Sequence, residues 1–252
     1  MWIVANGALK SGSTWIYQLL SQLEETSTTP PEFQQKGWKN ASVTQASVAD
    51  AARSLGARPE VFVSKQHWAR DNSYLLQQPG IKVVNIVRDI RDVIVSRFHH
   101  DKRTFGYPGS ISDFLRERME NMVAENVHYH SYWINSSYIS ADTYYVTSYE
   151  YLLDQYETAA RALFDFCGFP VSQASFQATL EQNLFRNKPK TGAGQFFRKG
   201  RAFSFGDDLT PEQSQMILDQ AQKLGFAGVK RKIADFNPEL TAYLEQTDLG
   251  LS

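Results

Sequence analysis

Residues 2–15 read WIVANGALKSGSTW, an apolar run that leads into a turn rich in glycine and serine and then into a helical pattern. The apolar run predicts a buried strand over residues 2–6, followed by a helix over residues 14–23. A glycine-rich turn between a strand and a helix presents free backbone N–H groups and the positive end of the helix dipole. This turn therefore predicts a site for a phosphate or sulfate group, although an ordinary β–α turn is the alternative.

Further apolar runs repeat the alternation of strand and helix along the chain. Strands are predicted over residues 61–64, 82–87 and 143–147, because runs that are apolar on nearly every residue are typical of a parallel sheet covered on both faces. Helical patterns cover residues 43–55, 89–99, 111–133, 156–167 and 210–225, with a last short helix from Asn237. The sequence therefore predicts a three-layer α/β fold, with a mainly parallel central sheet flanked by helices, as a single domain over residues 1–252.

Composition limits the class of protein. The 252 residues are 42% hydrophobic, which is enough for one sizeable core. The net charge of −1, without a basic run, predicts neither nucleic acid nor a membrane surface as a partner. No apolar stretch reaches the ~20 residues of a membrane span and no signal peptide is visible, so we expect a cytoplasmic location. Cys167, the single cysteine, is expected to be a small buried side chain.

The turn is close to the Walker A pattern G-x-x-x-x-G-K-[ST] but departs from it at the lysine. Gly7, Gly12 and Thr14 match that spacing, whereas Ser13 stands where the lysine would be. Lys10 lies three residues earlier, within the loop, where its ammonium group can reach an anion bound by the turn. A P-loop kinase for a small metabolite is therefore a second hypothesis, weakened by the missing lysine.

A second candidate anion ligand follows the strand over residues 82–87. Arg88 stands where that strand ends, at the sheet edge where open α/β folds bind ligands, and its guanidinium suits bidentate binding of an anion. Ser96 lies eight residues on, about two helical turns into the next helix. A salt bridge from Arg88 to Asp89 or Asp92 is the alternative interpretation.

Residues 187–208 have the composition of a lid loop. They hold four glycines and five basic residues, which is typical of a mobile loop over a site. Arg198, Lys199 and Gly200 follow one another, and two cations beside a backbone N–H group suit a doubly charged phosphate. A basic loop without a ligand is the alternative.

Residues 61–68 read VFVSKQHW and place a histidine just past the end of a buried strand. Of the five histidines, only His67 has this position at the predicted sheet edge. An imidazole with the ordinary pKa of about 6.5 is mostly neutral at physiological pH and can act as a general base. His99 is the alternative base, because it follows Ser96 on the same helix.

Taken together, these segments resemble the motifs of sulfotransferases that use 3′-phosphoadenosine-5′-phosphosulfate (PAPS). Residues 10–15, KSGSTW, are similar to the family's K-S-G-T-T-W loop, and residues 198–200 are similar to its R-K-G. Arg88 and Ser96 resemble its 3′-phosphate motif, and residues 65–67 resemble its K-x-H segment. The resemblance implies a P-loop-like nucleotide-binding sulfotransferase fold, PAPS as the donor, a small-molecule acceptor and no metal.

The resemblance also implies roles for single residues. Lys10 would contact the bridging oxygen of the leaving group, His67 would accept the acceptor's proton, and Lys65 would assist with the sulfuryl charge. The residues expected to hold the 5′-phosphate and the adenine are Lys10, Ser11, Gly12, Ser13, Thr14 and Trp15. The residues expected to bind the 3′-phosphate are Arg88, Ser96, Arg198, Lys199 and Gly200. Tyr149 and Phe185 are weaker candidates for adenine contacts, with core packing as the alternative.

Three departures from the family pattern are visible, and the acceptor is not predicted. Leu9 replaces the usual proline, the Gly-Asp-Trp that often follows R-K-G is missing, and so is a common dimerisation segment before it.

A phenol, an aliphatic alcohol and an amine are all open as acceptors, and a nucleotide-binding module without turnover is a further alternative. Candidate pocket residues are mostly aromatic: Phe33, Trp38, Trp68, Phe98, His99 and Trp133.

Overall fold

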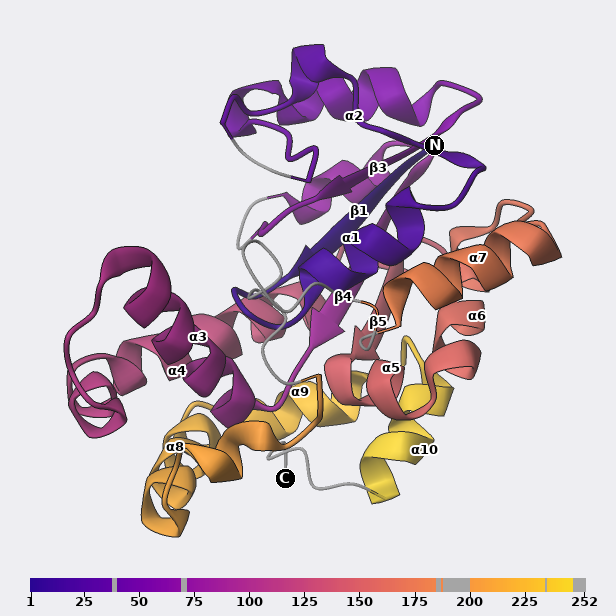
Figure 1. Cartoon of the computed structure of the whole chain (residues 1–252). Helices are drawn as coiled ribbons and strands as arrows, with labels where there is room; N and C mark the ends of the chain where they lie inside the picture. The colour runs from indigo at the N-terminus through magenta and orange to yellow at the C-terminus, as the bar shows by residue number, and fades with distance from the viewer. Residues whose placement is uncertain (38–39, 69–71, 185–186, 188–199, 234, 247–252) are drawn as a thin grey trace.

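Five parallel strands form the centre of the computed structural model, which describes residues 1–37, 40–68, 72–184, 187, 200–233 and 235–246 (Figure 1). In order across the sheet, the strands are β2 (Thr26–Thr28), β3 (Val61–Lys65), β1 (Trp2–Gly7), β4 (Ile81–Val87) and β5 (Tyr144–Ser148). The helices are α1 (Ser13–Ser21), α2 (Val48–Gly56), α3 (Ile90–Phe105), α4 (Ile111–Ile134), α5 (Tyr149–Asp154), α6 (Tyr156–Cys167), α7 (Gln173–Asn183), α8 (Pro211–Lys223), α9 (Phe226–Ile233) and α10 (Pro238–Gln246).

The first strand occupies the middle of the sheet and aligns the ends of its neighbours. Within the parallel pairs, Ala5 of β1 lies opposite Lys65 of β3, and Gly7 lies opposite Ile86 of β4. All six residues of β1 are buried, as expected for a strand covered on both faces. The segments that leave β1, β3 and β4 therefore emerge at one edge of the sheet, where ligands of α/β folds bind.

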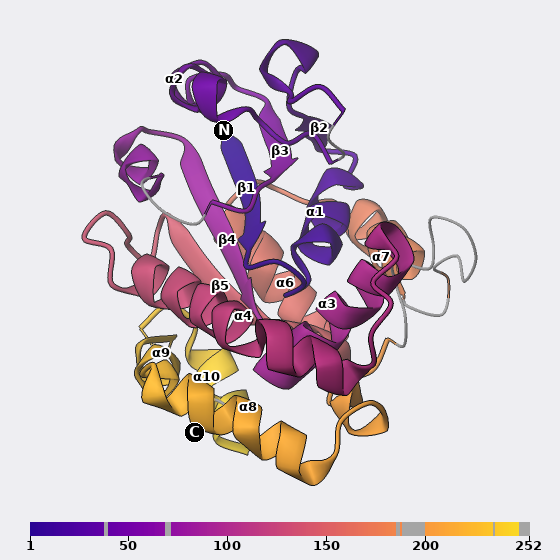
Figure 2. The same ribbon diagram turned by 90° about the vertical axis from the view of Figure 1, so that its left-hand side faces the viewer.

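Two adjacent tyrosines of β5 show how helices cover the sheet on both faces. Tyr144 stacks on Trp133 of α4, with ring centroids 5.9 Å apart. Tyr145 stacks on Phe166 of α6, with centroids 5.2 Å apart. Because successive strand side chains point to opposite faces, α4 and α6 cover opposite sides of the sheet. Helix α1 lies on the α6 side, in front of the strands in Figure 1, and α8 and α9 pack against α4 (Figure 2).

Local signals explain where the main helices begin and end. Ser110 and Asp113 form a capping box at the start of α4, and Thr210 and Gln213 do the same for α8. Helix α6 ends at Gly168, whose positive φ of 76° favours glycine. These features confirm the predicted starts of α4 and α8 and the predicted end of α6.

The α/β fold predicted from the sequence is confirmed, with some differences in its elements. All five strands are parallel, and four of them match the predicted runs within a residue or so. The helix predicted over residues 43–55 begins later, because a 3₁₀ turn capped by Thr44 precedes α2. Strand β2 and helices α5, α7 and α9 were not predicted.

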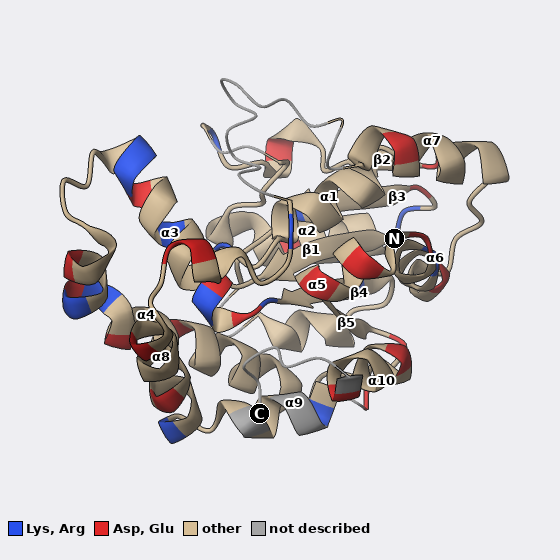
Figure 3. Ribbon diagram, turned by 60° about the horizontal axis from the view of Figure 1, so that its bottom comes forward, with Lys and Arg blue, Asp and Glu red and all other residues tan. Residues whose placement is uncertain are grey.

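The surface and the single thiol match the sequence expectations. Basic and acidic residues are interspersed over the helices (Figure 3), in line with the net charge of −1. Cys167 is fully buried, and burial raises the pKa of its thiol to about 12. Among the helices that the structure describes, none is long and apolar enough to cross a membrane.

Candidate functional site

The turn after β1 has two glycines that no other residue can replace without a clash. A Cβ on Gly7 would stand 2.5 Å from the hydroxyl oxygen of Ser11, and Gly12 has a φ of 115° and lies against the ring of Tyr149. The Ser11 hydroxyl donates a hydrogen bond to the Ala8 carbonyl over 2.7 Å and so closes the turn. Helix α1 begins directly after Gly12, without a side-chain cap.

This geometry leaves an anion-binding surface at the helix N-terminus. N–H groups at the start of a helix lack partners in a preceding turn, and the helix dipole adds positive potential there. The N–H of Trp15 donates to the Gly12 carbonyl over 2.8 Å, so the N–H groups of Ser13 and Thr14 are the ones placed to meet an anion. Ser13 is buried and Thr14 partly exposed at this end of α1. This geometry suits the phosphate or sulfate site that the sequence predicts, and the role of the turn stays a prediction.

Lys10 and Arg88, which are 78 positions apart in the sequence, meet at this edge. The backbone of Lys10 has a positive φ of 72°, and its carbonyl accepts a hydrogen bond from Nη1 of Arg88 over 3.3 Å. Burial, followed by the positive charges of Arg103 and Arg88, lowers the pKa of the Lys10 ammonium group to about 8. The structure thus places the Arg88 guanidinium against the backbone of Lys10, so the two residues that the sequence assigned to the two ends of a nucleotide meet at one edge.

Arg88 is partly neutralised in this structure. Its guanidinium lies over the ring of Tyr149, 4.1 Å from the centroid, and its Nη2 is 3.7 Å from a carboxylate oxygen of Asp92. The salt bridge that the sequence offered as an alternative is therefore present. The buried Nε of Arg88 still has no hydrogen-bond partner among the described residues, so the side chain keeps donor capacity for an anion.

A buried carboxyl group behind Arg88 was not recognised from the sequence. Glu150 accepts a hydrogen bond from the backbone N–H of Asp89 over 3.0 Å, at the point where β4 turns into α3. Burial raises the pKa of Glu150 to about 7, against the opposing effect of Arg88. Glu150 therefore anchors the strand end that carries Arg88, and its place directly after Tyr149 was the available sequence signal.

His67 is held in one tautomer by the carbonyl of Gly7. Its Nδ1 lies 2.7 Å from that carbonyl oxygen, which can only accept, so Nδ1 carries the proton and Nε2 carries the lone pair. Nζ of Lys65 lies 2.8 Å from Nε2 and donates to it. Burial and the charge of Lys65 lower the pKa of His67 to about 4, and burial lowers the pKa of Lys65 to about 8. The imidazole of His67 is therefore neutral at physiological pH.

A cavity of about 650 Å³ lies beside His67. It is bounded by the turn after β1, by one side of α3 and by one side of α4. Its lining residues are Gly7, Ala8, Leu9, His67, Val93, Arg97, Asn121, Met122, Ala124, Glu125, Asn126, His128 and Tyr129. A space of this size fits a small organic molecule next to the imidazole.

Comparison with known proteins places the chain in a family. The sulfotransferase domain model matches residues 2–224. The chain belongs to the sulfotransferase domain family. No curated protein sequence matches it at a significant level.

Solved structures support the fold of this sulfotransferase at low sequence identity. Mouse sulfotransferase SULT7A1 complexed with PAP is similar with a TM-score of 0.67 and 16% identity, over 97% of this chain and 87% of that one. Retinol dehydratase in a complex with retinol and PAP has a TM-score of 0.61 and 19% identity, over 88% and 80% of the two chains. Retinol dehydratase with androsterone and the inactive cofactor PAP has a TM-score of 0.60 and 17% identity over the same shares.

Some of the other predicted nucleotide ligands are described by the structure, and the rest lie outside the described part of the chain. The ring of Trp15 meets that of Tyr149 edge-on, with centroids 5.5 Å apart, directly behind the turn. Ser96 is partly exposed on α3, and Gly200 is partly exposed. Phe185, Arg198 and Lys199 lie outside the described residues, so their roles stay predictions. Among the described residues, no group of three or more His, Cys, Asp and Glu side chains is arranged to hold a metal.

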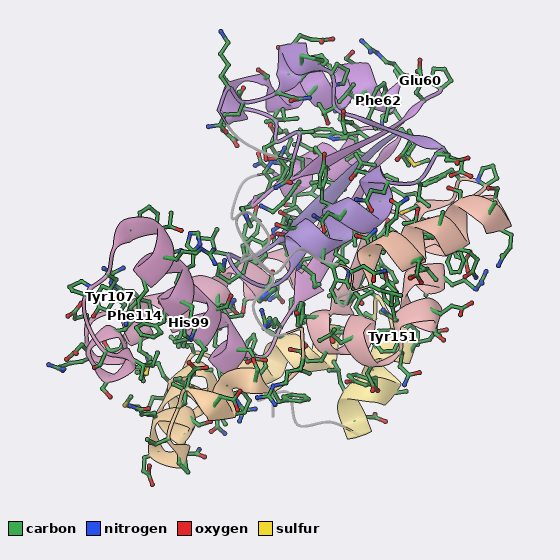
Figure 4. All side chains as sticks on the ribbon, in the orientation of Figure 1. Glu60, Phe62, His99, Tyr107, Phe114 and Tyr151 are labelled. Atoms are coloured by element: carbon green, nitrogen blue, oxygen red, sulfur yellow. The ribbon has the colours of Figure 1, made fainter. Side chains whose placement is uncertain are left out.

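The predicted pocket aromatics do not line the cavity in the described part of the sulfotransferase. Trp68 is a core residue that accepts a hydrogen bond at its carbonyl from the Trp133 indole over 2.7 Å. Phe98 is buried between α3 and α4, where Figure 4 labels its neighbours Phe114 and His99. These side chains serve packing because each is surrounded by other apolar groups.

Two further candidates, Phe33 and His99, also lie elsewhere. Phe33 is partly buried and packs against the core. The Nε2 of His99 lies 2.6 Å from a carboxylate oxygen of Asp208, so this alternative base is engaged in an ion pair or hydrogen bond. Trp38 lies outside the described residues.

Sequence reasoning missed the wall that α4 contributes to the cavity. Asn121, Glu125 and His128 are spaced four and three residues apart, which places them on one side of the helix. Helix α4 also buries Val123 and Val127 on its other side, so its pattern is mixed. The polar spacing was the signal, but only the fold shows that this side faces His67.

Proposed function

We propose that this sulfotransferase transfers a sulfuryl group from PAPS to a hydroxyl or amine of a small-molecule acceptor. The observation that carries the proposal is the meeting of three features at one sheet edge. These are the anion-binding turn, the Lys10–Arg88 contact over 3.3 Å, and a neutral His67 that faces the cavity. A cation for each end of the nucleotide and a base for the acceptor are what sulfuryl transfer requires.

Several features support a nucleotide with anionic groups on both its 3′ and 5′ sides. The glycine turn and the open N-terminus of α1 suit the 5′-phosphosulfate, with Ser11, Gly12, Ser13 and Thr14 around it. Arg88, whose buried Nε has no hydrogen-bond partner among the described residues, would bind the 3′-phosphate with Ser96, Arg198, Lys199 and Gly200. Trp15, Tyr149 and Phe185 would contact the adenine. The similar structures of SULT7A1 and retinol dehydratase are complexes with PAP, which supports this assignment.

His67 would act as the general base through Nε2. The Gly7 carbonyl fixes the proton on Nδ1, so the lone pair of Nε2 faces away from the backbone and can take the proton of an acceptor hydroxyl. Lys65 donates to that lone pair in this structure, over 2.8 Å. An acceptor hydroxyl would take the place of Lys65, and the released ammonium group would be free to bind the sulfuryl oxygens.

Lys10 would stabilise the other side of the reaction. As the acceptor oxygen forms its bond to sulfur, the bond from sulfur to the 5′-phosphate oxygen breaks, and negative charge grows on that oxygen. An ammonium group in a partly buried site stabilises such charge far more than one in water. The lowered pKa of Lys10, about 8, means that the group is still mostly charged at pH 7.

Ligand binding and product analysis separate this proposal from its alternatives. Thermal-shift measurements with PAPS, adenosine 3′,5′-bisphosphate and ATP should show stabilisation by the first two ligands. Incubation with PAPS and a panel of phenols, alcohols and amines should give a sulfated product by mass spectrometry. Stabilisation by ATP and a phosphorylated product would favour the kinase, and bisphosphate binding without product from any acceptor would favour a binding module.

A further inference from the structure

The cavity wall carries one acidic side chain whose charge is not compensated. Two charged residues of α3 and α4, Arg97 and Glu125, line the cavity. Nε of Arg97 lies 2.8 Å from one carboxylate oxygen of Asp101, but the other oxygen accepts from Arg118 over 2.8 Å, so Arg97 keeps part of its positive charge. That charge lies close enough to Lys10 to lower the pKa of its ammonium group, so it adds to the positive end of the cavity. Glu125 is exposed and forms no hydrogen bond or ion pair with any residue that the structure describes. In the part of the chain that the structure describes, the wall therefore presents a carboxylate without a partner to whatever fills the cavity.

The reactive end of the same cavity has the opposite charge. Lys65 stands beside His67, and Lys10 is close enough to lower the pKa of that imidazole by its charge. An acceptor with an ammonium group would be repelled from this end and attracted to the carboxylate on α4. The cavity therefore has a polarity that can orient a molecule with a hydroxyl at one end and a cation at the other.

We propose that Glu125 is a specificity-determining residue that selects acceptors carrying a protonated amine. The ammonium group binds the Glu125 carboxylate on α4, while the acceptor's hydroxyl points to Nε2 of His67. Asn121 and His128, on the same side of α4, add polar groups around that ammonium. This inference rests on the proposed function, because it takes the cavity beside His67 as the acceptor site.

Two phenols that differ in one group test the proposal by binding. 4-(2-Aminoethyl)phenol and 4-propylphenol have nearly the same shape, but only the first carries an ammonium group. Isothermal titration in the presence of adenosine 3′,5′-bisphosphate should show tighter binding of the amine by the native chain. Glu125→Gln should weaken binding of the amine about fivefold to tenfold and leave that of 4-propylphenol unchanged.

A matched variant on the same helix controls for a general change in charge. Glu120 is also exposed on α4 but does not line the cavity, so Glu120→Gln should change neither affinity. Glu125→Lys should weaken amine binding further, because it replaces attraction by repulsion. Equal affinity of the native chain and Glu125→Gln for the amine would overturn the proposal, and so would no binding of either phenol.

Turnover measured on the same variants separates this inference from the proposed function. Sulfation of both phenols without preference for the amine would overturn the role of Glu125 and leave the sulfotransferase reaction standing. Amine binding that depends on Glu125, without sulfated product from PAPS, would support the recognition site and count against the proposed reaction.

Discussion

The turn over residues 7–14 and the wall formed by α3 and α4 face the same cavity but are built in different ways. The turn is a contiguous segment whose shape follows from two glycines and a hydroxyl-to-carbonyl hydrogen bond. The wall is assembled from side chains of two helices that only the fold brings together. If the proposed function holds, the turn would carry chemistry common to every acceptor, whereas the wall would decide which acceptor is used.

The largest effect is expected from the residues that touch the reacting atoms. Lys10→Ala and His67→Ala should each lower kcat by at least about 10²-fold with every acceptor, because they remove charge stabilisation and the general base. Steady-state assays with PAPS and at least two acceptors measure this. Lys223→Ala, an exposed lysine of α8, is the control and should keep native kcat.

An acceptor-dependent loss would break the distinction between turn and wall. If His67→Ala reduced turnover with one acceptor and spared another, the base would not be common to all reactions. Near-normal kcat in either variant would remove that residue from the mechanism.

Arg88→Ala should act on the nucleotide and not on the acceptor. Loss of a guanidinium that binds a phosphate should lower the affinity for adenosine 3′,5′-bisphosphate about tenfold to 100-fold, with little change in the acceptor KM. Calorimetric titration measures the affinity. Since the Arg88 guanidinium also lies over Tyr149, Arg88→Lys tests whether charge alone suffices. A native affinity in Arg88→Ala would place the 3′-phosphate elsewhere.

The pH dependence of kcat/KM for PAPS should reflect the lowered pKa values of Lys10, Lys65 and His67. Lys10 and Lys65 have pKa values of about 8 in the ligand-free protein, so they lose positive charge as the pH rises through 8. The pKa of His67 is about 4, so its imidazole stays neutral, and able to accept a proton, at pH values well below the ordinary histidine pKa of 6.5. The kcat/KM for PAPS should fall above pH 8, about tenfold per pH unit at most for each lysine, and should not fall through pH 6.5.

A loss of kcat/KM with a midpoint near pH 6.5 would contradict this electrostatic picture of His67. The wild-type protein alone is sufficient for the measurement, and far-UV circular dichroism at each pH controls for unfolding.

A smaller effect is expected from the apolar part of the wall. Met122 lines the cavity from α4 and is only partly buried. Met122→Ala should change acceptor KM roughly threefold to tenfold, in a direction that depends on acceptor size. It should leave the affinity for adenosine 3′,5′-bisphosphate at the native value. A change in nucleotide affinity would mean that wall and turn are not separable.

The same contrast explains which parts of the molecule the sequence could predict. Four of the strands, β1, β3, β4 and β5, are buried apolar runs that the sequence shows clearly. Because Lys10, His67 and Arg88 follow the ends of three of these runs, the sequence predicted that they lie at one edge of a parallel sheet. Strand β2 was missed because it has only three residues, Thr26–Thr28, which are polar and largely exposed. Helix α5 was missed because it starts at Tyr149, directly after β5 ends.

Side chains that depend on packing were harder to assign than those in motifs. Trp68 and Phe98 look like pocket residues in the sequence, yet both are core residues in the fold. Glu125 and His128 look like solvent-facing helix residues, yet they line the cavity. The alternation of polar and apolar residues shows which side of a helix is buried, but it does not show which neighbour the polar side faces.

High-resolution mass spectrometry of the acceptor after incubation with PAPS is the most direct test of the proposed reaction. Sulfation and phosphorylation differ in exact mass, so one spectrum separates the two group transfers. We predict a sulfated acceptor with PAPS and the native chain, and at least about 10²-fold less of it with His67→Ala. A phosphorylated acceptor formed from ATP, or equal sulfation by the native chain and His67→Ala, would contradict the account.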